Sequence, residues 1–276
     1  MQKVIYGLIG LVVLACLLGA YQKVTLKADE GHLQDLLDYS VLVKNSQGGQ
    51  GTGVIFVNGD KVFCWTAAHC VTDCGRNVER TVNGETKKFW EWDEVQLIRV
   101  RNYNGRKTGF VTFFAKVIRY SEVEDVALLQ VYEDASFFKS ATFAPVNYSP
   151  RLNTQVWHSG GFWGIPGAGS FSSGYICNLG RLRAPLGHEE WRGPKIMDQV
   201  NIIAAPGSSG GGVIEKDTGH VIGLLTETIN SIAGAYLILP TRRLWDYAER
   251  ANCLFAMDKT QSVPEGFDVE LTEYFK

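Results

Sequence analysis

Short runs rich in Val, Ile, Leu and Phe alternate with glycine-containing turns along most of the chain. Runs of this length, bounded by turn residues, are typical of β-strands rather than of long amphipathic helices. Residues 54–57 and 61–66 are two such runs, and they flank the Asn-Gly-Asp sequence at 58–60. An Asn-Gly pair between strands favours a tight hairpin. The pattern therefore predicts a mostly β protein.

The same pattern continues in the second half of the chain. Residues 156–180 contain Gly164, Pro166 and Gly174 as turn residues between apolar residues. Two more apolar runs occupy 220–229 and 235–240. A helical pattern from about Thr241 to Ala251 then predicts a C-terminal helix.

The N-terminal segment differs from the rest of the chain. An almost unbroken apolar stretch of 17 residues runs from Val4 to Ala20. This length lies between the apolar region of an export signal and a short membrane span. We therefore treat residues 1–30 as a signal peptide or a membrane anchor. The protein is expected to be exported, either anchored in a membrane through residues 4–20 or secreted or periplasmic after cleavage.

Composition and charge limit the size of the core and the kinds of partner that the protein can bind. With 276 residues, 45% of them hydrophobic, the chain can bury one large core or two small ones. The formal net charge is −2, and no run of Lys and Arg is present that could follow a phosphate backbone. We therefore expect no nucleic-acid partner.

Three of the six cysteines, Cys64, Cys70 and Cys74, lie close to His69 in the sequence. A metal site there is disfavoured, because the segment has neither a C-x-x-C pair nor a second histidine. We therefore expect no metal, and one disulfide within this group that leaves one thiol over. Cys177 and Cys253 either form a disulfide or remain buried thiols.

Two adjacent serines in the sequence GSSGG at 207–211 raise the question of a nucleophile. The glycine frame fits both a G-x-S-x-G and a G-x-S-G-G turn, and both choose Ser209 over Ser208. An α/β-hydrolase needs an acid and then a histidine after the serine, but only His220 follows, and no strand carrying an acid fits between the two. The opposite order, with His69 and Asp125 before the serine, is available.

Three motifs carry a resemblance to a known family. They are Thr66-Ala67-Ala68-His69-Cys70, Asp125-Val126-Ala127-Leu128-Leu129 and the GSSGG turn. Together they resemble the trypsin-like (chymotrypsin-fold) serine proteases, and bacterial Deg-type protease domains without a PDZ domain are the most similar in pattern.

The resemblance implies a double six-stranded β-barrel with a C-terminal helix, preceded by an N-terminal hydrophobic helix. The first barrel would comprise residues 31–147, with His69 and Asp125. The second barrel and the helix would comprise residues 148–252, with Ser209. An acidic tail at 253–276 would follow, extended or loosely packed.

The resemblance also implies roles. His69 would be the general base, Asp125 would orient its ring, and Ser209 would attack the carbonyl of a protein or peptide substrate. Glu122 and Glu124 compete for the role of Asp125. The N–H groups of Gly207 and Ser209 would form the oxyanion hole, and no metal or organic cofactor is needed.

The sequence departs from the family pattern at two positions. Many members have a cysteine sixteen residues before the one that follows the histidine, but Val54 stands there. Many also have an aspartate before the nucleophile, which pairs with a newly cut N-terminus. Ser208 cannot form that ion pair, so we expect no zymogen activation of that kind.

The substrate pocket is inferred by counting from the nucleophile, which puts its base near Ile203. One wall would run from Leu225 through Thr226 and Glu227 to Thr228, and another would start at Ala235. This set predicts an apolar pocket for small to medium aliphatic side chains, unless Glu227 turns inward. The alternative function is a catalytically silent binding or scaffold module on the same fold, although such proteins usually lack a triad residue and none is missing here.

Overall fold

The computed structural model describes residues 30–82, 85–103, 106–161, 170–183, 195–229 and 234–267. Six strands form a closed barrel in the order β1-β2-β3-β8-β7-β6. Their bounds are β1 Ser40–Lys44, β2 Gln50–Asn58, β3 Lys61–Thr66, β6 Val95–Tyr103, β7 Arg106–Ser121 and β8 Val126–Val131. The hairpin predicted around 58–60 is confirmed, since Asn58 pairs with Lys61 across it.

Six further strands form a second closed barrel in the order β10-β11-β14-β13-β12-β9. Their bounds are β9 Gln155–Gly160, β10 Ser170–Arg183, β11 Lys195–Val200, β12 Gly212–Glu215, β13 Val221–Thr228 and β14 Tyr236–Pro240. The predicted double barrel is therefore confirmed. Gly174 lies within β10, whereas Gly164 and Pro166 lie outside the described residues.

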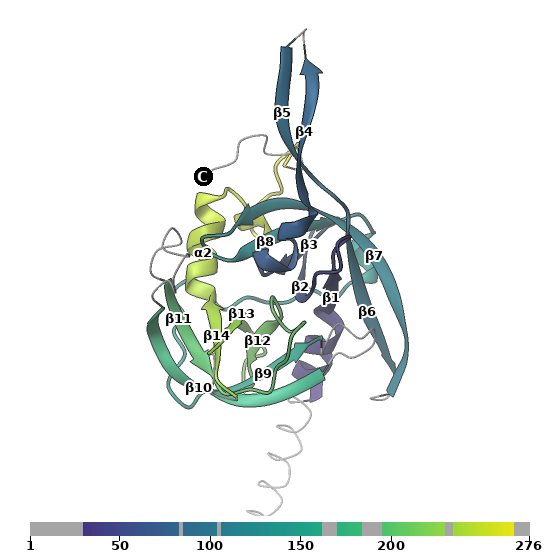
Figure 1. The fold of residues 1–276 in the computed structure, drawn as a ribbon. Helices are drawn as coiled ribbons and strands as arrows, with labels where there is room; N and C mark the ends of the chain where they lie inside the picture. Colours follow the sequence, from purple (N-terminus) through teal and green to yellow (C-terminus); the bar gives the residue numbers. More distant parts are fainter. Residues whose placement is uncertain are drawn as a thin grey trace, which may run out of the picture.

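Helix α2 (Thr241–Arg250) follows β14 directly and lies alongside both barrels (Figure 1). It matches the predicted C-terminal helix. Its buried residues, Leu244, Tyr247 and Ala248, face the core, and the Tyr247 ring lies 6.2 Å from that of Trp65 in β3. A helix from the second half of the chain thus packs on the first barrel.

Strands β4 (Gly75–Val82) and β5 (Glu85–Trp92) form a separate two-stranded sheet. This hairpin projects away from the first barrel (Figure 1). Short 3-10 helices complete the described elements: η1 Ala68–Cys70, η2 Thr72–Cys74, η3 Ala135–Phe137 and η5 Leu254–Ala256.

The segment after α2 packs against β3 of the first barrel. The rings of Phe255 and Phe267 lie 5.2 and 5.6 Å from that of Phe63 in β3. The indole N–H of Trp65 donates to the carbonyl oxygen of Ala256 at 2.8 Å. Residues 253 and 255–257 are therefore buried rather than loosely packed, because they complete an apolar core, whereas residues 259–262 and 264–266 are exposed. The rest of the predicted tail lies outside the described residues.

The predicted signal peptide or anchor at residues 1–30, including the expected hydrophobic helix, falls almost wholly outside the described residues. The described chain starts in a helical segment at residues 30–39, which buries Leu36 and Tyr39. Among the helices that the structure describes, none combines the length and the apolar character needed to cross a bilayer.

The expected disulfide is wrong. Cys64, Cys70, Cys74, Cys177 and Cys253 are all free thiols. Cys64 and Cys70 contact different carbonyl groups. Cys64 Sγ lies 3.8 Å from the carbonyl oxygen of Trp65, and Cys70 Sγ lies 3.6 Å from that of Ser209. Their short spacing in the sequence did not predict a disulfide correctly, because Cys64 lies in β3 and Cys70 lies in η1, and the two side chains point to different partners.

Candidate active site

Strand β3 ends at Thr66, Ala67 follows it, and His69 is the second residue of η1. Its Nδ1 is 2.9 Å from Oδ2 and 3.1 Å from Oδ1 of Asp125. Its backbone N–H also donates to Asp125 Oδ1 at 3.0 Å. A carboxylate can only accept, so Nδ1 carries the hydrogen and Nε2 is left free to accept a proton.

Asp125 is held in an unusual backbone conformation. It ends the loop between β7 and β8 with φ = +54°, in the left-handed region that residues with a Cβ rarely occupy. Its side chain is 8% exposed, compared with 47% for that of His69. A buried carboxylate thus supports a half-exposed imidazole, which suits a ring that must be oriented and also reached by substrate.

The two competing glutamates do not bond to His69. The Glu122 carboxylate accepts from the hydroxyl of Tyr120 at 3.1 Å. The Glu124 carboxylate bonds to Arg243 and Arg250 of helix α2. Of the three acids in this loop, only Asp125 contacts the imidazole.

The electrostatics of the pair favour an ionised carboxylate. Burial by itself would raise the pKa of Asp125, but the hydrogen bonds from His69 and the nearby Lys195 cation outweigh it, so the pKa is lowered. Burial likewise opposes charge on His69, but its hydrogen bond to Asp125 raises the pKa of the ring above its ordinary value. The pair therefore stabilises an imidazolium once a proton arrives.

The two serines of the glycine frame have different environments. Ser208 is buried, and its hydroxyl donates to the carbonyl oxygen of Gly161 at 3.0 Å while accepting from the N–H of Ala205 at 3.3 Å. Ser209 is half-buried. Neither the hydroxyl nor the N–H of Ser209 has a hydrogen-bond partner among the described residues. Ser208 therefore holds the turn together, and Ser209 is the serine available for chemistry.

Two glycines shape this turn. Gly207 has φ = +97° and Gly210 has φ = +83°. A Cβ on Gly210 would lie 2.3 Å from the carbonyl oxygen of Thr52, so only glycine fits. Within the described part of the chain the N–H of Gly207, like that of Ser209, makes no hydrogen bond. Two unpaired donors at one turn are what an oxyanion hole requires.

Thr52, in β2 of the first barrel, binds the nucleophile turn of the second. Its N–H donates to the carbonyl oxygen of Ser209 at 2.7 Å, and its hydroxyl donates to that of Gly207 at 2.7 Å. The N–H of Gly161 donates to the same hydroxyl at 2.8 Å. Thr52 was not among the residues predicted from the sequence. The available signal was its place between Gly51 and Gly53, where a Cβ would lie 2.2 Å from Cys70 Sγ and 2.3 Å from Cys64 Sγ, respectively.

Contacts through Cys70 bring the nucleophile turn beside η1. Cys70 follows His69 in the chain, and its Sγ lies 3.6 Å from the carbonyl oxygen of Ser209. The Ser209 hydroxyl and the His69 ring, both described, are not hydrogen-bonded to each other in this structure. His69 and Asp125 are thus hydrogen-bonded to each other, whereas Ser209 is held near them through its carbonyl oxygen, which contacts Cys70 and Thr52.

His158, in β9, lies beneath the nucleophile turn and was also missed. It is 1% exposed, and its Nδ1–H donates to the carbonyl oxygen of Gly212 at 3.0 Å. Its Nε2 is buried with no partner among the described residues. Burial lowers the pKa of His158 to about 4, so the ring is neutral. A Cβ at Gly160 or Gly211 would lie 2.6 Å from this ring, which explains both glycines.

The predicted pocket residues lie on several elements. Leu225 on β13 bonds to the nucleophile turn: its carbonyl oxygen accepts from the Gly210 N–H at 2.6 Å. Thr226 and Ala235 are buried, Glu227 is half-buried and Thr228 is exposed. Ile203 is 70% exposed, so its side chain points largely into solvent.

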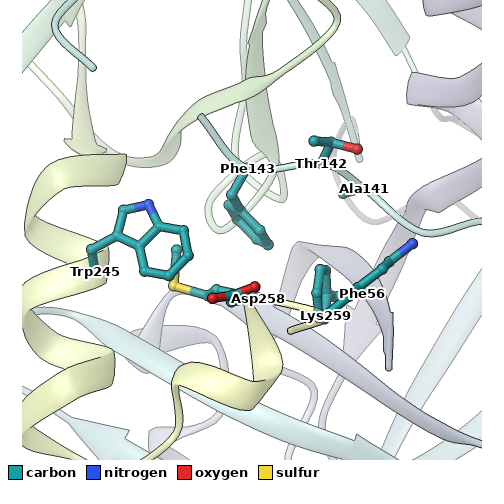
Figure 2. Close-up of a pocket in the computed structure, with 8 residues that line it drawn as sticks. Phe56, Ala141, Thr142, Phe143, Trp245, Asp258 and Lys259 are labelled. Atoms are coloured by element: carbon teal, nitrogen blue, oxygen red, sulfur yellow. The ribbon is translucent and has the colours of Figure 1, made fainter. Parts of the chain in front are cut away.

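A separate pocket of about 270 Å³ lies between helix α2, the segment joining the barrels and the segment after α2 (Figure 2). None of the predicted site residues lines it. Its lining residues are Phe56, Ala141, Thr142, Phe143, Trp245, Met257, Asp258 and Lys259. Within the described ranges, no three side chains of the metal-binding types gather into a cluster.

Solved structures with this architecture include several bacterial proteases. A serine endoprotease from Yersinia pestis has a TM-score of 0.56 and 17% identity, over 80% of this chain and 65% of that one. The Rv3671c protease in its inactive form has a TM-score of 0.54 and 20% identity, over 79% and 91%. The HtrA-type protease AlgW with tripeptide has a TM-score of 0.57 and 16% identity, over 82% and 63%. The chain thus spans less than two thirds of the Yersinia protein and of AlgW.

Sequence comparison gives the family. A search of curated protein sequences gave no match. The sequence model of the trypsin-like peptidase domain matches residues 51–224, which include His69, Asp125 and Ser209. Because this match covers more than half of the chain, and the double barrel agrees with it, the protein belongs to the trypsin-like peptidase domain family.

Proposed function

We propose that the protein is a serine endopeptidase that uses His69, Asp125 and Ser209. The observation that carries the proposal is the His69–Asp125 pair, in which the carboxylate accepts from both the ring and the backbone N–H of the histidine. That geometry leaves Nε2 as the basic atom. The Ser209 hydroxyl and the N–H groups of Gly207 and Ser209, which bond to none of the described residues, supply the remaining parts.

The proposed reaction starts when Ser209 Oγ attacks the carbonyl carbon of a peptide bond while His69 Nε2 takes the hydroxyl proton. The N–H groups of Gly207 and Ser209 stabilise the oxyanion of the tetrahedral intermediate. His69 then gives the proton to the leaving amine, and an acyl-enzyme forms. Water attacks the acyl-enzyme by the same route and releases the acid.

A fluorophosphonate probe tests the assignment, because it labels only an activated serine. We expect labelling of the wild type and none of Ser209→Ala or His69→Ala. Ser208→Ala is the matched control: it removes the neighbouring hydroxyl, and its labelling is expected to persist. Labelling that survives Ser209→Ala contradicts the proposal, and a folded wild type that is not labelled favours the silent binding module.

The substrate preference is part of the proposal. Leu225, which bonds to the nucleophile turn, and the buried, uncharged Thr226 and Ala235 support an aliphatic residue before the cleaved bond. Peptides with Val or Ala at that position are expected to be cleaved faster than a matched Arg peptide. Faster cleavage of the Arg peptide would point to Glu227 as a residue that turns into the pocket.

A further inference from the structure

The loop that carries Asp125 is held in place from two sides. On the side of the first barrel, the hydroxyl of Tyr120 bonds to Glu122 and to Thr72 Oγ1. Within the loop, the N–H of Asp125 donates to the carbonyl oxygen of Glu122 at 3.2 Å. These contacts fix the start of the loop, but Asp125 itself remains in the left-handed region, which is unfavourable for a residue with a Cβ. Such a conformation persists only where the surroundings impose it.

The second anchor of the loop comes from helix α2. The Glu124 side chain, 10% exposed, forms ion pairs with Arg243 and, at 3.0 Å, with Arg250. Its two carboxylate oxygens are each taken by a different arginine. The arginines are seven residues apart, two helical turns, and so lie on the same face of α2.

The arginines connect this loop to the rest of the molecule. Arg243 Nη1 also donates to the carbonyl oxygen of Ile196 in β11 at 3.2 Å. At the end of α2, Arg119 in β7 donates through Nε to the carbonyl oxygen of Ala251 at 2.8 Å. Helix α2 is thus bonded to the second barrel, to β7 and to the loop that β7 leads into. Glu124 is the point at which the helix reaches the residue next to Asp125.

We infer that Glu124 is a positioning residue, through which Arg243 and Arg250 of the C-terminal helix hold the backbone of Asp125 in the conformation that directs its carboxylate to His69. Glu124 and Asp125 are adjacent, and their side chains face opposite ways, one to the helix and one to the imidazole. Pinning the first side chain therefore restricts the peptide that sets φ of the second. The kinetic part of this inference rests on the proposed function.

The kinetic test compares Glu124→Ala and Glu124→Gln in the full chain. A displacement of about 1 Å in a catalytic group can cost about a hundredfold in rate. We expect kcat of Glu124→Ala to fall by about tenfold or more with KM little changed, since no substrate contact is lost. Glu124→Gln keeps one acceptor oxygen and is expected to recover part of kcat.

The matched control is Asp198→Asn. Asp198 in β11 is fully buried and accepts two 2.7 Å bonds from Arg242, so it joins the same helix to the second barrel without touching the Asp125 loop. This variant is expected to lower the unfolding midpoint while kcat stays within twofold of the wild type. Equal losses of kcat in Asp198→Asn and Glu124→Ala at equal stability, or an unchanged kcat in folded Glu124→Ala, would overturn the inference.

A spectroscopic test does not depend on proteolysis. The chemical shift of the His69 Nδ1 proton reports its hydrogen bond to Asp125. We expect it to move towards that of a solvent-exposed imidazole in Glu124→Ala, and less in Arg250→Gln, whose arginine side chain is 59% exposed. It should not move in Asp198→Asn. If the wild type proves inactive but the chemical shift still changes in Glu124→Ala, the inference stands and the proposed function is rejected. If the wild type is active but neither the shift nor kcat changes in Glu124→Ala, only the inference is rejected.

Discussion

The backbone N–H of Thr52 in the first barrel donates a 2.7 Å hydrogen bond to the carbonyl oxygen of Ser209 in the second. Its hydroxyl adds a bond to the carbonyl oxygen of Gly207. Thr52 therefore holds the Gly207–Ser208 and the Ser209–Gly210 peptide groups. His69 and Asp125 belong to the barrel that contains Thr52. Strand β2 therefore links the barrel of His69 and Asp125 to the turn that carries Ser209.

Thr52→Val is expected to impair the site without altering its shape. The valine has nearly the same volume, but it leaves the Gly207 carbonyl and the Gly161 N–H unpaired in a buried position. Each unpaired group costs about 1–3 kcal/mol of unfolding free energy. For the two groups together we expect a loss of about 2–6 kcal/mol by denaturant titration, and a fall in kcat. Thr52→Ser keeps the hydroxyl and should retain kcat; a folded Thr52→Val with unchanged kcat contradicts this role.

Gly210→Ala is expected to abolish the nucleophile turn. The added Cβ would meet the Thr52 carbonyl oxygen and Thr66 Oγ1, each at 2.3 Å, in a backbone conformation that already disfavours a side chain. We expect loss of fluorophosphonate labelling and a lower unfolding midpoint. Gly48→Ala is the control, because Gly48 also has a positive φ but has open space around it. Its cost should be only the backbone penalty of about 1–2 kcal/mol, with labelling intact.

The pH dependence of kcat/KM should follow His69. The base must be neutral to take the serine proton, so activity is lost as pH falls through its pKa. Since the hydrogen bond to Asp125 raises the pKa of His69, the acid limb is expected above the ordinary histidine value of about 6.5. NMR titration of His69 in Ser209→Ala should give the same midpoint. A limb well below 6.5 would mean that Asp125 does not stabilise the imidazolium.

The buried ring of His158 should make the fold sensitive to acid. The pKa of His158 is lowered to about 4 in the folded chain, against about 6.5 when unfolded, so between these values only the unfolded chain binds the proton. Its contribution to stability is therefore complete above pH 6.5 and is lost as pH falls to about 4, which amounts to about 3 kcal/mol.

The matched variant is His158→Asn, which keeps a donor near the Gly212 carbonyl but does not titrate. Its unfolding free energy should depend less steeply on pH between about 6.5 and 4 than that of the wild type. Denaturant titrations at several pH values measure both slopes. Parallel slopes would show that the proton uptake on unfolding comes from another group.

The sequence predicted the parts of the site that depend on local pattern. The hairpin at 58–60 and the TAAHC motif placed His69 just after a strand, and the motif that starts at Asp125 favoured this residue over Glu122 and Glu124. Those features are set by neighbours in the chain. The double barrel followed from the family resemblance.

Contacts between distant segments could not be predicted in this way. Thr52 with Ser209, and Glu124 with Arg243, are pairs that only the packing of two barrels and a helix brings together. The expected disulfide failed for the same reason, since nearness in sequence did not give nearness of sulfur atoms. Counting from the nucleophile put Ile203 at the base of a pocket, but loop conformation decides where that side chain points, and it is largely exposed.

The packing of Phe255 and Phe267 on Phe63 has a consequence for biosynthesis. Strand β3, which leads to His69, is synthesised well before the aromatic residues that cover it. A nascent chain that stops at β14 exposes this apolar surface and lacks the helix that binds Glu124. The N-terminal barrel can therefore reach its final packing only after Phe267 has been synthesised, and until then its uncovered apolar face is open to aggregation.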